Sequence, residues 1–197
     1  DIRNHPDFAP IRQAIFDDKP VVSNMTPPKV VGELKYLDPD AVAAECRQFT
    51  RALEGQSPTG TFFTAPSPGI VATAIPNEYY DSFDAYLRAI TDAVAVEYRA
   101  IIEHGFDLQI DAPDLALEGH GHFADRPRSE FLAFVEQVID EIRRVTADLP
   151  QDRIRLHACW GNYEGPHVCD ISMDKMFSTL MSTKAQSVLF ETSNPRH

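Results

Sequence analysis

The sequence predicts an α/β fold of the (β/α)8-barrel type, of which this chain covers about five strands. Short β-branched or apolar segments alternate with amphipathic helices, which indicates parallel strands joined by right-handed crossovers. Polar residues stand at the C-terminal ends of several expected strands, where barrel enzymes carry their chemistry. No glycine-rich phosphate loop follows a strand, which argues against a nucleotide-binding doubly wound sheet.

Each expected element has a local signal. Asp38 is a typical N-cap before Pro39, and the helix that they open runs to Leu53. Ser82 is expected to cap a long helix that ends before Gly105, and further helices are expected from Ser129 to Val145 and over 172–184. Met176, Phe177, Leu180 and Met181 are expected to face inward on the last helix. The expected strands are 29–36, 61–65, 106–111, 153–159 and 187–192.

These elements indicate one incomplete (β/α) barrel domain over residues 1–197. Residues 1–28 form an N-terminal lead-in, 29–192 carry the strand–helix repeats, and 193–197 are a truncated C-terminal end. Five strands cannot close an eight-stranded barrel, so we expect the chain to be part of a longer polypeptide.

Composition narrows the classes of partner. A net charge of −12 argues against a nucleic-acid or phospholipid-surface role. The longest uncharged stretch, 55–77, contains four prolines and cannot be a spanning helix, so no membrane role is expected. No leader-like segment opens the sequence, and three cysteines do not make a disulfide framework. We therefore expect a soluble, cytoplasmic protein.

His157 and Cys159 are the first candidates for chemistry. Residues i and i+2 of a strand point to the same face, so the imidazole and the thiol can converge on one zinc ion. Glu191 ends the next expected strand in an apolar context, where a carboxylate needs a cation or strong donors. The alternatives are a buried histidine and cysteine in the core, and an ion pair between Glu191 and Arg196.

Other polar residues leave alternatives open. Asp111 is either a substrate-binding or base carboxylate at the mouth or a cap for the loop before Pro113. The pair His120 and His122 lies between glycines, which favours a solvated loop over a metal site. Some aromatic residues either line a pocket or pack in the core. These are Trp160, Tyr163, Tyr79 and Tyr80.

Three segments carry a resemblance to a known family. The segments 108–115 (LQIDAPDL), 154–159 (IRLHAC) and 189–193 (LFETS) resemble the catalytic barrel of cobalamin-independent methionine synthase, and 27–36 resembles a preceding strand. The resemblance implies a zinc ion held by His157, Cys159 and Glu191, with a further cysteine from beyond this chain. It also implies that Asp111 orients the substrate by holding the amino group of homocysteine.

Loop motifs resemble a particular branch of the same superfamily. The segments 77–80 (NEYY), 160–167 (WGNYEGPH) and 194–197 (NPRH) are similar to epoxyalkane:coenzyme M transferases and methionine-synthase-like proteins. Ala112 and Trp160 depart from the synthases, which usually have Glu and Tyr there. The implied function is zinc-dependent transfer of a methyl or alkyl group to a small thiol. Trp160 is then expected to bind substrate, and His167 or Tyr163 to donate a proton.

Several other functions remain open. One is an epoxide-opening transferase of the coenzyme M type. Another is a barrel enzyme without metal, similar to uroporphyrinogen decarboxylase, with Asp111 acting on an anionic substrate. A third is a non-catalytic partial barrel whose strand edges associate with a second copy or another chain.

Overall fold

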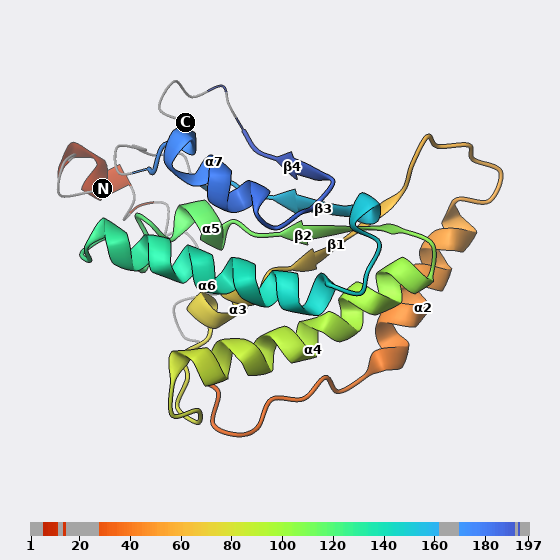
Figure 1. The fold of residues 1–197 in the computed structure, drawn as a ribbon, viewed down its shortest axis with the longest axis horizontal. Coiled ribbons are helices and arrows are strands. Elements are labelled where there is room, and N and C mark those ends of the chain that lie inside the picture. Colours follow the sequence, from red (N-terminus) through yellow and green to blue (C-terminus); the bar gives the residue numbers. More distant parts are fainter. Residues whose placement is uncertain (1–5, 12–13, 15–27, 162–169, 192, 194–197) are drawn as a thin grey trace.

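The computed structural model describes residues 6–11, 14, 28–161, 170–191 and 193. At its centre lies one parallel sheet of four strands in the order β1-β2-β3-β4 (Figure 1). The strands are β1 (Phe62–Pro66), β2 (Asp107–Asp111), β3 (Ile154–His157) and β4 (Ser187–Leu189). The α/β class and the parallel pairing expected from the sequence are confirmed.

Asp38 and Ser82 cap their helices as the sequence indicated, whereas the helix expected from Ser129 begins at Arg128, after Pro127, without a side-chain cap. The Asp38 carboxylate accepts hydrogen bonds from the first backbone N–H groups of its helix, and Ser82 accepts one from Ala85 at 3.1 Å. Two short helices were not predicted, and one of them begins after Ser67, whose hydroxyl accepts from Ile70. The helices are α2 (Pro39–Ala52), α3 (Pro68–Ala74), α4 (Phe83–Glu103), α5 (Asp114–Leu117), α6 (Arg128–Thr146) and α7 (Met173–Met181). The 3-10 turns are η1 (Pro6–Phe8) and η2 (Gln151–Arg153).

The predicted strand over 29–36 was wrong. Val30 makes only an isolated parallel bridge to Asn77, through hydrogen bonds with Pro76 and Glu78. Val30 is buried and Val31 is 73% exposed, as in an extended segment, but the pairing of 29–36 does not extend beyond this one bridge. Inward positions were also wrong for Phe177 and Met181, which lie exposed on α7, whereas Met176 and Leu180 are buried as expected.

The two faces of the sheet differ in polarity. On β2 and β3, Leu108, Ile110, Ile154 and Leu156 are buried in the core, where α4 and α6 pack side by side against the sheet (Figure 1). Full burial of each such side chain contributes about 1.5–3 kcal/mol. The alternate residues Gln109, Asp111, Arg155 and His157 are partly exposed on the opposite face. The pattern places polar side chains on one face of a sheet whose other face is the core.

The order of the strands bears on the choice between α/β architectures. Each strand pairs with the next one along the chain, without a reversal of order. A (β/α) barrel has this order, whereas a doubly wound sheet reverses at a switch point. The four described strands form an open parallel sheet. No helix in the described ranges is long and apolar enough to cross a membrane.

Candidate functional site

A row of side chains crosses the C-terminal edge of the sheet. The register aligns Pro66 with Asp111, Asp111 with His157, and His157 with Leu189. Backbone hydrogen bonds continue past the strand ends, from Ala112 to His157 at 2.8 Å and from Ala158 to Leu189 at 3.0 Å. These bonds fix the ends of β2, β3 and β4 relative to one another, so the residues that follow them share one rigid edge.

Asp111 and His157 form a hydrogen-bonded pair at this edge. Oδ1 of Asp111 contacts Nδ1 of His157, and both side chains are partly exposed, at 42% and 33%. With Nδ1 engaged by the carboxylate, Nε2 is the ring nitrogen left to bind a ligand or exchange a proton. A carboxylate that holds the second nitrogen of a histidine is a common feature of metal sites, because it fixes the ring and raises its basicity.

Cys159 lies on the same face as His157. Ala158 and Trp160 are buried in the core, while Cys159 between them is partly exposed, so the alternation of β3 continues past its last residue. Burial raises the pKa of the Cys159 thiol from 9.0, and the charges of Asp111 and Asp114 act in the same direction. A hydrogen bond from the backbone N–H of Gly161 opposes this rise in pKa. At neutral pH the thiol therefore stays protonated unless a cation replaces the proton.

Glu191 stands two residues beyond Leu189, as Cys159 stands two beyond His157. Its carboxylate is exposed and accepts hydrogen bonds from the backbone N–H and the hydroxyl of Ser193. Within the described ranges, no three His, Cys, Asp or Glu side chains are grouped closely enough to hold a metal ion. The structure thus joins His157 to Asp111 and sets Cys159 beside them, with Glu191 bound to Ser193. Arg196, its alternative partner, lies outside the described residues.

Trp160 has a packing role in this structure. Its side chain is 1% exposed, and its indole N–H donates to the carbonyl of Ile171 at 2.6 Å. The side chain therefore packs in the core, and the expected substrate contact of Trp160 stays a prediction. The expected proton donors Tyr163 and His167 lie outside the described residues.

The loop with two histidines is only partly solvated. His122 is exposed, as the flanking glycines suggested, but His120 is 15% exposed and its Nδ1 lies 2.9 Å from Oδ1 of Asp170. Asp170 is itself buried, with 1% of its side chain exposed. The prediction of a solvated loop was therefore wrong for His120, because its partner stands 50 residues further along the chain.

Sequence reasoning missed a second carboxyl group beneath the row. Asp114 is fully buried and accepts a hydrogen bond from the Ser67 hydroxyl at 2.5 Å, so it ties the end of β1 to the end of β2. Burial raises the pKa of Asp114 to about 7, with the Ser67 hydrogen bond acting against this rise. Gly69 is required beside it, since a Cβ there would come within 2.1 Å of Oδ2. The signal was present as an aspartate inside the apolar segment 112–117.

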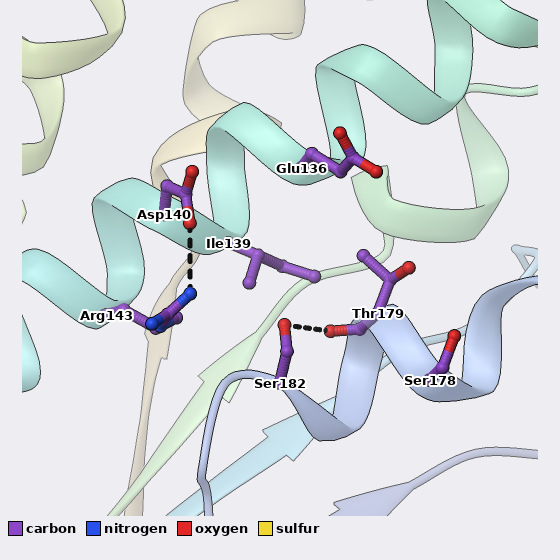
Figure 2. Close-up of a pocket in the computed structure, with 7 residues that line it drawn as sticks. All are labelled: Glu136, Ile139, Asp140, Arg143, Ser178, Thr179 and Ser182. Atoms are coloured by element: carbon purple, nitrogen blue, oxygen red, sulfur yellow. Dashed lines mark hydrogen bonds and ion pairs between the residues drawn. The ribbon is translucent and has the colours of Figure 1, made fainter.

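Two surface grooves of the described residues lie away from this row. A groove of about 300 Å³ separates α6 from α7, and its walls carry acidic and hydroxyl side chains together with Arg143 (Figure 2). In it Arg143 pairs with Asp140 at 3.2 Å, and the Ser182 hydroxyl donates to the carbonyl of Thr179. A second groove lies between α4 and α6. Both are formed by the helical layer, and neither is lined by residues of the polar row.

Comparison with known proteins adds no assignment. No protein-family model matches the sequence, and no curated protein matches it. The function is accordingly argued from the geometry of these residues.

Proposed function

We propose that this chain carries the thiol-activating site of a zinc-dependent transferase, which moves a methyl or alkyl group to a small thiol. The observation that carries the proposal is the fixed imidazole of His157, held at Nδ1 by Asp111, with the Cys159 thiol two residues further on the same face. The consecutive strand order supports a (β/α) barrel, in which chemistry lies at this edge of the sheet.

The donor types fit zinc. An imidazole nitrogen, a thiolate and a carboxylate are its usual ligands, and three protein ligands leave a position open for substrate. Nε2 of His157 and Sγ of Cys159 would supply two of them, and the Glu191 carboxylate would supply the third in place of its bonds to Ser193. When bound, the ion would remove the proton of a coordinated substrate thiol at neutral pH. Asp111 would keep the His157 ring in the orientation that this requires.

The transfer itself is a displacement at carbon. The electron pair of the substrate thiolate forms a sulfur–carbon bond, and the bond from that carbon to its leaving group breaks with its electron pair on the leaving atom. A methylated folate and an epoxide both fit as donors, because each has a leaving nitrogen or oxygen that needs a proton. The described cysteines, Cys46 and Cys159, are free thiols, which fits a reducing compartment such as the cytoplasm.

Substitution of His157 by Ala tests the proposal. We expect the zinc-loaded parent to alkylate a small thiol from a methyl donor or an epoxide, and the His157→Ala variant to lose this activity at least a hundredfold, roughly the contribution of one essential group. The matched control is His104→Ala. His104 is the C-cap of α4, before the N-terminal end of β2, and its Nδ1 is hydrogen-bonded to the carbonyl of Ala100. Equal activity in His157→Ala and the control would contradict the proposal.

A smaller effect is expected for Asp111. In Asp111→Asn the neutral amide holds the imidazole without increasing its basicity, so the affinity for zinc should fall about tenfold to a hundredfold. Competition with a chelator of known affinity measures this change. An unchanged affinity would show that the contact between Asp111 and His157 does not serve metal binding.

A further inference from the structure

Gln109 on β2 carries a buried hydrogen-bond acceptor next to the candidate site. It stands two residues before Asp111, so the alternation of the strand places both side chains on the same face of the sheet. Its Oε1 atom is buried and has no hydrogen-bond partner in the described part of the chain. A buried acceptor without a donor is costly, so such an atom in a folded protein calls for an explanation. A donor that arrives on a bound molecule is one that the position of Gln109 allows.

Arg155 lies on the side of Gln109 that faces away from the candidate site. In the register, Gln109 lies between Thr64 on β1 and Arg155 on β3. The Arg155 guanidinium lies over the ring of Phe62, 4.2 Å from its centre, so the Arg155 side chain crosses β2, the strand between them (Figure 1). Phe62 is aligned with Asp107, two residues before Gln109. The guanidinium is therefore directed toward the N-terminal end of the sheet, away from the strand ends that carry the row.

The other side of Gln109 faces the row at the strand ends. The next residues on this face are Asp111 and His157, which are hydrogen-bonded to each other and partly exposed. Two residues of a parallel strand span about 6.6 Å, a distance that the Gln109 side chain and a short ligand bridge together. A thiol bound beside His157 would therefore bring the group at its other end toward the Gln109 amide.

We propose that Gln109 determines which thiol the site accepts, by taking a hydrogen bond at Oε1 from a hydroxyl or amino group of the substrate. This inference rests on the proposed function and names the class of thiol that it uses. The sulfur lies at the strand ends, and the polar group lies one layer deeper, where it supplies the donor that Oε1 lacks. A thiol with a methyl group in that place is disfavoured, because a site built to hydrogen-bond a substrate group rejects the analogue without it.

Two thiols of nearly equal size test this role, because 2-mercaptoethanol carries a hydroxyl where 1-propanethiol carries a methyl group. In the zinc-loaded parent with methyl iodide as the alkyl donor, we expect kcat/KM for 2-mercaptoethanol to exceed that for 1-propanethiol about tenfold or more, after subtraction of the reaction without protein. In Gln109→Leu the two values should come within about threefold of each other, because the value for 1-propanethiol rises while that for 2-mercaptoethanol falls. Damage to the fold would lower both values.

Two further variants make the outcomes distinguishable. Gln109→Met nearly keeps the length of the side chain and removes the amide, so it should show the same loss of preference. Gln137 is exposed on α6 and hydrogen-bonded to Asp84, so Gln137→Leu should keep the preference of the parent. Equal kcat/KM for the two thiols in the parent, or a folded Gln109→Met that keeps the preference or loses both activities, overturns the role of Gln109 while the proposed function stands. If the zinc-loaded parent alkylates neither thiol, the proposed function is contradicted and this inference falls with it.

Discussion

Replacement of Cys159 by Ser should abolish zinc binding and thiol alkylation together. A serine hydroxyl does not ionise at neutral pH, and it is a poor ligand for zinc compared with a thiolate. Loss of a residue that only orients a zinc ligand lowers the affinity for zinc about tenfold to a hundredfold. Loss of the ligand itself should therefore lower the affinity more than about a hundredfold. Zinc per chain after dialysis and the rate of alkylation of 2-mercaptoethanol measure the two effects.

Cys46 provides the matched control for this experiment. It is fully buried on α2, in the helical layer, and takes no part in the row at the strand ends. Cys46→Ala removes a thiol from the chain without touching the site, so it should retain zinc and activity. Circular dichroism of both variants establishes that each is folded. Full zinc content in folded Cys159→Ser would show that the thiol is not a ligand.

Substitution of Asp114 by Asn should change how stability depends on pH. The pKa of Asp114 is raised to about 7 in the folded chain, against 3.8 ordinarily. Between these values the folded state keeps a proton that the unfolded state has released, so the free energy of unfolding falls as pH rises from about 4 to 7 and then levels off. For the parent this group accounts for a loss of roughly 2–3 kcal/mol between pH 5 and pH 8. In Asp114→Asn the side chain does not titrate, so the free energy of unfolding should not show this loss.

Urea unfolding of parent and variant at pH 5 and pH 8 measures the difference directly. The control is Asp148→Asn, which removes an exposed carboxylate that pairs with Arg99 at the surface. Its pH dependence should match that of the parent, because exposed ion pairs contribute little. If Asp114→Asn also follows the parent at both pH values, Asp114 is not the buried group that the structure describes.

Much of the fold could be predicted because local signals and burial agree. The N-caps Asp38 and Ser82 begin their helices as expected, and four of the five expected strands form. The prediction of a strand over 29–36 was wrong because it used only the local β-propensity of the β-branched residues. A strand also needs a neighbouring strand along its whole length, and this segment has only one bridge. Phe177 and Met181 lie on a helical face that periodicity alone assigned to the core.

The site was predictable where it depends on strand geometry. Spacing within one strand predicted that His157 and Cys159 share a face. The contact between Asp111 and His157 was not predicted, because it depends on the register between β2 and β3. The pairs that join distant loops were not predictable, because Ser67 with Asp114 and His120 with Asp170 become neighbours only when the crossovers fold. The sequence indicated such residues only by placing a polar residue inside an apolar segment.

The most direct test of the central claim is the amount of zinc bound per chain, measured by elemental analysis on untagged protein after dialysis, with His157→Ala alongside. Near one zinc per chain in the parent and little in the variant is the result that the site predicts. No zinc in either protein would contradict the zinc-dependent mechanism and leave the parallel sheet without a metal function.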